Sequence, residues 1–198
     1  MLPGEFEYRR ATSVEEAVSL LAENEEAKLL AGGHSLLPMM KLHFAAPSML
    51  VDIGGIQGLA FTKQDGNSLV VGSMTTHAHI AASDAVAAEH GALAAAAASI
   101  GDVQVRNRGT IGGSLAHADP AADYGAATLA LDAQIELMGP NGQRSVDATN
   151  FFSGFLSTSM EPAELITAIR FPSTENSVSV YEKFAQPASG FAIVGVAA

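Results

Sequence analysis

Short apolar runs alternate with amphipathic stretches over the first 55 residues of the chain. One stretch, "SVEEAVSLLAE", has apolar residues at helical spacing and opens with a capping box in which Ser13 stands three residues before Glu16. The expected elements are, in order, a strand at residues 5–11, a helix at 13–23, a strand at 28–31, a helical turn at 36–42 and a strand at 48–53. This order of strands and helices favours an α/β layer.

From residue 56 onward the pattern changes to hairpins and longer helices. Asp65-Gly66 and Asn141-Gly142 each stand between two strand-like runs, as the turns of β-hairpins do. Pro120 suits the first turn of a helix, because the N–H that proline lacks is not needed there. The expected elements are hairpins at residues 65–66 and 141–142, Ala-rich helices within 76–100 with an interruption near residue 83, a helix at 121–131, and strands at 163–172 and 177–186.

These patterns together predict an α+β protein with two lobes. The small lobe, at about residues 1–55, would have the order βαβαβ. The larger lobe, at about residues 56–176, would have a mainly antiparallel sheet with flanking helices.

Acidic residues dominate the charge of the chain. Its 198 residues include 10 Lys and Arg against 21 Asp and Glu, so the net charge is −11. This balance argues against nucleic-acid binding, which depends on Lys and Arg to neutralise phosphates. The chain has no cysteine, so it can supply neither a disulfide nor a thiolate ligand for an iron–sulfur cluster. No apolar run has the length of a signal-peptide core or a membrane span, so we expect a cytoplasmic protein without a transmembrane segment.

Two glycine pairs, Gly32-Gly33 and Gly112-Gly113, carry the candidate chemistry. The first lies in "AGGHSLLP" and the second in "RNRGTIGGSLAHADPAADYG". Glycine lets a loop approach a ligand closely and adopt positive φ, so that backbone N–H groups converge on an anion. One such loop in each lobe suggests a cleft that holds a phosphate-bearing cofactor from both sides. A single glycine pair is more often only a turn, and neither spacing matches the Rossmann or the P-loop pattern.

Both stretches resemble one protein family. "AGGHSLLPMMKL" and "RNRGTIGGSLAHADPAADYGAATLALDA" are similar to the two FAD-binding signatures of the medium, flavin-carrying subunit of molybdenum hydroxylases. Enzymes of the carbon monoxide dehydrogenase type and the flavin domain of xanthine dehydrogenase belong to this family. The resemblance extends from Phe6 to the last residue and implies an FAD-binding domain of PCMH type. Residues 177–198 resemble the start of the family's separate C-terminal domain, and we expect that domain to be truncated here.

The resemblance also implies which residues hold FAD. The backbone N–H groups of both glycine stretches and the Ser35 hydroxyl would surround its pyrophosphate. Asp123 would lie near the adenosine and ribityl parts, Ile166 would contact the cofactor, and Lys183 would lie close to the flavin ring, where a cation favours negative charge on the reduced flavin. The implied cofactor-binding residues are Ala31, Gly32, Gly33, His34, Ser35, Thr110, Ile111, Gly112, Gly113, Ser114, Asp123, Ile166 and Lys183. The resemblance implies no catalytic residue and no metal ligand on this chain.

By the same resemblance, the chain would be the electron-transfer subunit of an oxidoreductase complex. A molybdopterin-containing large subunit would oxidise the substrate, and a small subunit with two [2Fe–2S] clusters would pass electrons to the flavin. The external acceptor would be a quinone, NAD or oxygen. Two other hypotheses stay open. One is a truncated nucleotide-binding or assembly module that no longer catalyses; the other is a direct oxidase of the vanillyl-alcohol oxidase or cell-wall reductase type, for which the chain lacks a substrate domain.

Other polar residues have simpler interpretations. His77 and His79 point to different faces of a helix and have no supporting acidic or cysteine cluster, so a solvated helix start is favoured over a metal pair. Arg106 and Arg108 suit either a phosphate or partner contact or ordinary surface salt bridges. The seven methionines are expected to fill the core.

Overall fold

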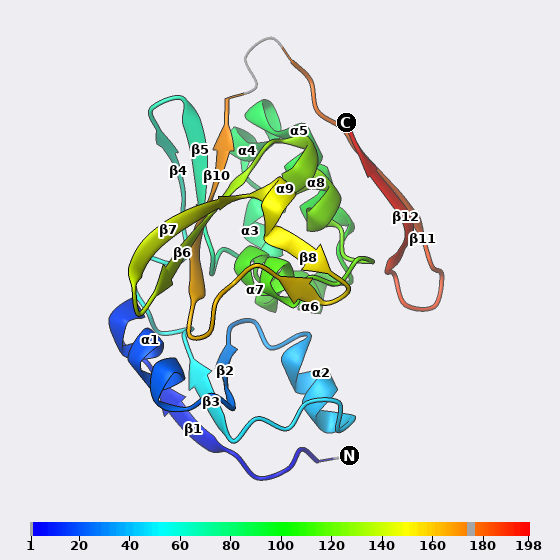
Figure 1. The fold of residues 1–198 in the computed structure, drawn as a ribbon. Helices are drawn as coiled ribbons and strands as arrows, with labels where there is room; N and C mark the ends of the chain where they lie inside the picture. The colour runs from blue at the N-terminus through cyan, green and yellow to red at the C-terminus, as the bar shows by residue number, and fades with distance from the viewer. Residues whose placement is uncertain (1, 174–176) are drawn as a thin grey trace.

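The computed structural model describes residues 2–173 and 177–198. In the view of Figure 1 a small sheet lies below a large one, and a separate hairpin near the C-terminus lies to one side. The α+β fold predicted from the sequence, with a mainly antiparallel sheet and flanking helices, is confirmed. Within the described residues, no helix is both long and apolar enough to cross a membrane.

The small sheet is parallel and is built from the N-terminal part of the chain. Its elements are β1 (Glu7–Arg10), α1 (Val14–Glu23), β2 (Ala27–Leu30), α2 (Leu36–Lys41) and β3 (Met49–Asp52). The strands lie in the order β1-β3-β2, and each helix carries the chain back to the start of the next parallel strand. The predicted β-α-β-α-β order is therefore confirmed.

Helix α1 begins at the predicted capping residue. The Ser13 hydroxyl accepts the backbone N–H of Glu16 at 3.1 Å. The Glu16 carboxylate accepts hydrogen bonds from the hydroxyl and the backbone N–H of Thr12. In a standard capping box it would instead accept the N–H of the capping residue itself, Ser13. The hydrogen bonds from Thr12 lower the pKa of the Glu16 carboxyl.

The large sheet has five antiparallel strands in the order β4-β5-β10-β6-β7. The strands are β4 (Thr62–Asp65), β5 (Ser68–Gly72), β6 (Gln134–Gly139), β7 (Gly142–Asp147) and β10 (Leu165–Pro172). Both predicted hairpins form, although their two-residue loops are Gly66-Asn67 and Pro140-Asn141, each shifted by one residue from the expected pair. Strand β10 joins the two hairpins into one sheet.

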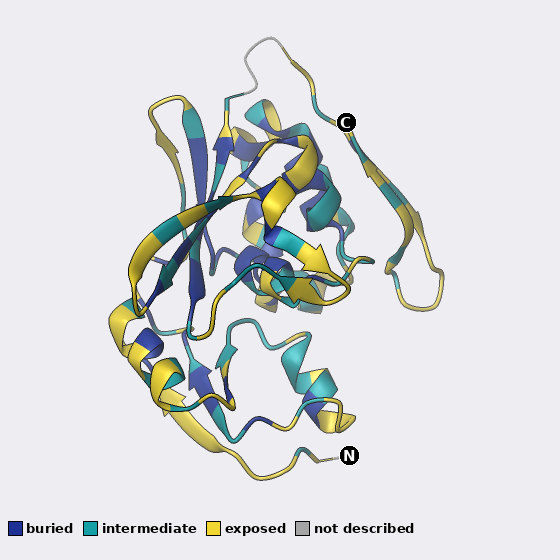
Figure 2. Cartoon of the chain, viewed as in Figure 1, coloured by how far each residue is buried: buried dark blue, intermediate teal, exposed yellow. Residues whose placement is uncertain are grey.

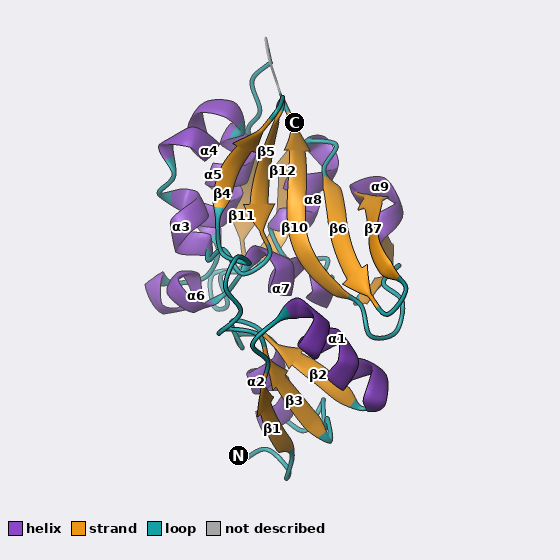
Figure 3. Cartoon of the chain, turned by 90° about the vertical axis from the view of Figure 1, so that its left-hand side faces the viewer, coloured by secondary structure: helices purple, strands orange, loops and turns teal. Residues whose placement is uncertain are grey.

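Helices cover one face of the large sheet (Figure 3). They are α3 (His77–Ala81), α4 (Asp84–Glu89), α5 (Gly91–Ser99), α6 (Val103–Arg108), α7 (Ile111–His117), α8 (Tyr124–Ala130) and α9 (Ala148–Phe151). The predicted interruption of the Ala-rich stretch occurs at Ser83, whose hydroxyl accepts the N–H of Val86 and caps α4. A second break, at His90 before α5, is not among the predicted elements.

Helix α8 begins later than the sequence pattern predicts, and the placement of Pro120 in its first turn is wrong. Asp119 gives the reason. Its carboxylate accepts the N–H of Ala121 at 2.9 Å, and its carbonyl oxygen accepts the N–H of Ala122 at 2.9 Å. These bonds close a turn around Pro120, so that the helix starts only at Tyr124.

The hydrophobic core has two parts, and buried residues lie in both sheets (Figure 2). The larger part lies between the large sheet and its helices. The smaller part lies between the small sheet, α1 and the loop that follows β3, and it includes Leu165 from the start of β10. Met138 on β6 also packs against this smaller part. The two sheets therefore share apolar packing.

Two short hairpins complete the described chain. They are formed by β8 (Phe152–Gly154) with β9 (Ser157–Thr158), and by β11 (Tyr181–Ala185) with β12 (Ala192–Ala197). The C-terminal hairpin β11–β12 packs its inner face on α5 and α8, while Phe184, Val194 and Val196 are exposed on its outer face (Figure 2). The predicted limit of the larger lobe, at residue 176, lies outside the described residues.

Candidate cofactor site

The first glycine pair lies in the loop between β2 and α2. Gly33 has a φ of +77°, a left-handed conformation that glycine adopts without strain. Four successive backbone N–H groups of this loop donate no hydrogen bond to any residue that the structure describes: those of Gly32, Gly33, His34 and Ser35. The loop is partly exposed, and His34 is exposed. Successive unpaired donors at the surface can bind an anion.

The second glycine pair lies in helix α7, which corrects the prediction of a second loop. Thr110 is the N-cap of this helix, and its hydroxyl accepts the N–H of Gly113 at 3.2 Å. The remaining N–H groups of the first turn donate to backbone carbonyls: Ile111 to Thr75, Gly112 to Ser73, and Ser114 to Thr110. The backbone donors of residues 111–114 are therefore already paired within the protein.

The two glycine stretches touch each other. A Cβ atom at Gly32 would lie 2.2 Å from the carbonyl oxygen of Arg108 and 2.8 Å from the Cα of Gly109. A side chain cannot occupy that space, because both neighbours are backbone atoms. A Cβ at Gly113 would lie 3.6 Å from the Cβ of Ala31, which is ordinary contact. The fold thus brings the two predicted stretches together, as a shared site requires.

Packing explains some of the glycines without a ligand. At Gly112 a Cβ would lie 2.6 Å from the Cβ and 2.8 Å from the carbonyl oxygen of Ser73. At Gly33 the nearest atom would be the flexible end of Leu37, at 2.9 Å, and positive φ is the stronger requirement. Glycine at positions 32 and 112 therefore serves close packing, and glycine at position 33 shapes the first loop.

His77 lies against the second glycine stretch, and its burial corrects the prediction of a solvated helix start. The residue is 4% exposed, its Nδ1 lies 3.1 Å from the Tyr124 hydroxyl, and a Cβ at Gly109 would lie 2.5 Å from its Nε2. Burial lowers the pKa of His77 to about 4, although the Asp123 carboxylate opposes the shift. His77 is therefore neutral at pH 7. Among the described residues, no group of three or more His, Asp or Glu side chains is placed to hold a metal ion.

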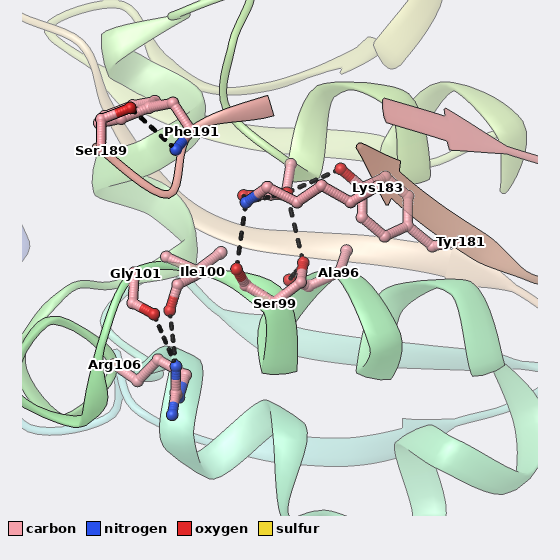
Figure 4. Close-up of polar contacts among 10 residues, drawn as sticks. Ala96, Ser99, Ile100, Gly101, Arg106, Tyr181, Lys183, Ser189 and Phe191 are labelled. Carbon is pink, nitrogen blue, oxygen red and sulfur yellow. Dashed lines mark hydrogen bonds and ion pairs between the residues drawn. The ribbon is translucent and has the colours of Figure 1, made fainter. Parts of the chain in front are cut away.

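Asp123 and Lys183 form a buried ion pair. The Lys183 ammonium lies 2.9 Å from Asp123 Oδ1 and 3.1 Å from Oδ2, and the two side chains are 7% and 6% exposed, respectively. Lys183 also donates to the carbonyl oxygen of Ser99, and the Tyr181 hydroxyl donates to Asp123 Oδ1 at 2.7 Å (Figure 4). The pair ties the C-terminal hairpin to the end of α5 and the start of α8. Lys183 is thus paired with a carboxylate, and its expected place close to the flavin ring stays a prediction.

Two other predicted contact residues are buried in the core. Ile111 is 0% exposed, and Ile166, on β10, is 5% exposed and packs among the large-sheet residues. Ser35, Ser114 and Ala31 are partly exposed around the contact between the two stretches. Direct contact of each of these residues with a cofactor stays a prediction.

Sequence reasoning missed three polar residues of this region, Tyr181, Ser99 and Tyr124. The sequence could have indicated Tyr181, because it stands two residues before Lys183 in a predicted strand. Alternate residues of a strand lie on the same face, so Tyr181 and Lys183 are expected on one side. The other two had no such indication. Tyr124, for example, meets His77 across 47 residues of sequence.

A family model matches most of the chain, including both glycine stretches. Residues 4–174 match the family described as the FAD binding domain in molybdopterin dehydrogenase. The match includes both glycine stretches and Asp123, and it ends before β11.

Known proteins extend the similarity over the whole chain. The carbon monoxide dehydrogenase medium chain of Hydrogenophaga pseudoflava is 45% identical over 199 residues, covering 100% of this chain and 69% of that protein. The glyceraldehyde dehydrogenase medium chain of Sulfolobus acidocaldarius is 39% identical over 197 residues, and the alignment covers 100% of this chain and 70% of that protein. A solved structure of the Hydrogenophaga pseudoflava carbon monoxide dehydrogenase aligns with a TM-score of 0.94 at 45% identity, over 98% of this chain and 69% of that one.

The family match, the similarity over the whole of this chain and the structural alignment all point to one family. The chain therefore belongs to the FAD-binding domain family of molybdopterin dehydrogenases, and it is an FAD-carrying oxidoreductase subunit of the molybdenum hydroxylase type.

Proposed function

We propose that this chain holds the FAD pyrophosphate at the first glycine loop and carries electrons within a molybdenum hydroxylase complex. The observation that supports this proposal most is the run of four successive unpaired N–H groups at residues 32–35. Hydrogen bonds from N–H groups to a charged oxygen are roughly twice as strong as neutral ones. Such short-range donors can hold a diphosphate even on a chain whose net charge is −11.

The other residues of the site would bind and orient the rest of the cofactor. We assign the Ser35 hydroxyl and the start of α7, residues 110–114, to the diphosphate region, where Thr110 and Ser114 carry hydroxyls. Asp123 would accept hydrogen bonds from cofactor hydroxyls, and the Lys183 ammonium, 2.9 Å from its Oδ1, would hold that carboxylate in place. Ile166 would contribute backbone or apolar contact. When bound, FAD supplies a carrier that accepts electrons singly and releases them in pairs.

The wider electron path is part of the same proposal. A small subunit with [2Fe–2S] clusters would deliver electrons that a molybdopterin-containing large subunit has taken from the substrate, and a quinone, NAD or oxygen would receive them. The relatives are named medium chains or medium subunits, which supports a multi-subunit complex. The chain has no cysteine, so thiolate-bound clusters must lie on another chain.

We also propose limits for the structural units. The small lobe would end near residue 55 and the FAD-binding domain near residue 176, with residues 177–198 opening a further domain. Strand β3 ends at Asp52 and β4 begins at Thr62, so a boundary between them crosses no strand pairing. The C-terminal hairpin pairs only within itself among the described strands, which supports its assignment to a separate unit.

The test is a titration of the cofactor-free chain with FAD. Binding is measured as quenching of the flavin fluorescence. We expect one non-covalent FAD per chain, released by acid, because the chain has no cysteine for a thioether link. Gly33→Ala strains a φ of +77° and distorts the donors, and Ser35→Ala removes a hydroxyl. Hydrogen bonds to a charged group are worth about 1.5–3 kcal/mol, so each variant should weaken binding about tenfold.

Gly4→Ala is the matched control, because a Cβ at Gly4 would have no atom within 4 Å. This variant should bind FAD like the unchanged chain. The proposal fails if Gly33→Ala and Ser35→Ala are folded and bind FAD as tightly as Gly4→Ala. It also fails if the flavin stays with the polypeptide after acid denaturation.

A further inference from the structure

The Asp123 carboxylate is held unevenly by its neighbours. Its Oδ1 has three polar groups within reach: the Tyr181 hydroxyl at 2.7 Å, the Lys183 ammonium at 2.9 Å and the Ser99 hydroxyl at 3.3 Å. Its Oδ2 receives only the Lys183 ammonium, at 3.1 Å, among the described residues. A carboxylate oxygen accepts about two hydrogen bonds, so Oδ1 is filled while Oδ2 keeps acceptor capacity.

The Tyr181 hydroxyl is the main neutral donor to this carboxylate. Ser99 has one hydroxyl proton, and its oxygen lies 2.8 Å from the carbonyl oxygen of Ala96, which is nearer than Asp123 (Figure 4). That proton serves the shorter bond. Tyr181 makes no other side-chain hydrogen bond within the described chain, so its proton is committed to Asp123.

In the C-terminal hairpin, Gly195 leaves space for the Tyr181 hydroxyl. Tyr181 is 6% exposed, and a Cβ at Gly195 would lie 2.5 Å from the Tyr181 oxygen. Gly195 pairs with Lys183 across the hairpin, so the residue opposite the lysine leaves room for the tyrosine hydroxyl. Burial raises the pKa of Tyr181 well above its ordinary value, and the hydrogen bond to Asp123 adds to the shift. The hydroxyl therefore remains a donor throughout the working pH range.

We propose that Tyr181 is a positioning residue for FAD binding: by donating to Oδ1 it fixes the Asp123 carboxylate so that Oδ2, which already accepts Lys183, can accept one further hydrogen bond from a hydroxyl of the cofactor. This inference rests on the proposed function, in which Asp123 contacts FAD. It extends the site beyond the family match, which covers residues 4–174, into the C-terminal hairpin. The hairpin then contributes to cofactor affinity through two side chains of one strand, Tyr181 and Lys183.

The first experiment compares Tyr181→Phe with Tyr8→Phe in the full chain. Phenylalanine keeps the buried ring and removes only the hydroxyl, so Tyr181→Phe should fold and melt within a few degrees of the parent chain. Its Kd for FAD should rise about tenfold, which corresponds to about 1.4 kcal/mol. Tyr8 also donates its hydroxyl to an aspartate, Asp52, but on the small sheet. Tyr8→Phe should leave the Kd unchanged.

The second experiment asks whether Tyr181 acts through Asp123. Asp123→Asn combined with Lys183→Met removes both buried charges at once and leaves neither unpaired. This background should itself bind FAD more weakly than the parent chain. Adding Tyr181→Phe to it should change the Kd less than twofold, because the carboxylate that the hydroxyl orients is gone.

The outcomes separate this inference from the proposed function. Tyr181→Phe binding FAD like the parent, or lowering affinity equally in both backgrounds, would overturn the positioning role. If the Asp123/Lys183 background binds FAD like the parent while Gly33→Ala does not, Asp123 makes no cofactor contact and the inference is overturned with the glycine loop retained. If Gly33→Ala also binds FAD like the parent chain, the proposed function itself is contradicted, and the inference that rests on it is contradicted as well.

Discussion

The two glycine stretches look alike in sequence and differ in backbone structure. In the first, Gly33 turns at positive φ and four successive N–H groups point to no acceptor in the described chain. In the second, the glycines lie in the first turn of α7. Ser73 accepts the N–H of Gly112, Thr110 that of Gly113 and Thr75 that of Ile111. One stretch therefore leaves its backbone donors unpaired within the described chain, whereas the other uses them to join a helix to the large sheet.

This difference assigns different reasons to the same residue type. Gly32 and Gly112 are required because another backbone passes where a Cβ would be. Gly33 is required because of its φ. A substitution at one of these glycines therefore tests packing or ligand binding, depending on the position.

The largest effect is expected from Gly32→Ala. Its Cβ would lie 2.2 Å from the Arg108 carbonyl oxygen, and neither backbone can yield without separating the two stretches. Overpacking that forces the backbone to shift costs roughly 1–3 kcal/mol and occasionally more, and we expect the upper end of that range here. Urea denaturation should show that loss of unfolding free energy together with weakened FAD binding. Gly4→Ala should show neither, and a Gly32→Ala protein of parental stability would mean that the two stretches do not pack in this way.

Lowering the pH should reduce the unfolding free energy of the chain, because His77 is buried in its neutral form. Its pKa is about 4 in the folded protein and about 6.5 when exposed, so the unfolded chain binds more protons between these values. The stabilisation is complete above pH 6.5 and is lost as the pH falls toward 4. The full difference is about 3 kcal/mol.

Urea denaturation at several pH values between 7 and 4 measures this loss. His77→Gln should be less stable at pH 7, because the buried imidazole and its contact with Tyr124 are removed. Its stability should also depend less on pH than that of the parent chain. Parallel pH profiles for the two proteins would contradict the burial of a neutral His77.

A smaller effect is expected when the cap of α7 is removed. Thr110→Val leaves the Gly113 N–H without its acceptor and should cost about 1 kcal/mol of unfolding free energy. Ser83→Ala removes the cap of α4, away from the glycine stretches, and should cost a similar amount. Only Thr110→Val should also weaken FAD binding, by a few-fold. Equal FAD affinity of the two variants would remove Thr110 from the proposed site.

Local signals in the sequence were sufficient for much of the fold. The capping box at Ser13, the break at Ser83 and the turn residues of both hairpins act over a few residues, and each predicted the element that the structure contains. The helical state of "TIGGSL" could not be predicted in this way. Two glycines oppose a helix by about 1 kcal/mol each, and carbonyl oxygens of Ser73 and Thr75, far away in sequence, stabilise it.

Less of the candidate site than of the fold could be predicted from the sequence. The glycine pairs suggested a phosphate, but only the family resemblance named FAD and the residues around it. The pairing of Lys183 with Asp123 joins positions 60 residues apart, and His77 becomes buried only when Gly109 and Tyr124 pack against it. Such long-range contacts leave no periodic pattern in the sequence.

The most direct test of the account is amide hydrogen exchange at the two glycine stretches, measured with and without FAD. Without FAD, the amides of residues 32–35 should exchange fast and those of residues 111–114 slowly, since only the latter are hydrogen-bonded. On adding FAD, residues 32–35 should become protected, while residues 111–114 change little. Protection of residues 32–35 before FAD is added, or fast exchange there that FAD does not slow, would contradict the assignment of the first loop to the pyrophosphate.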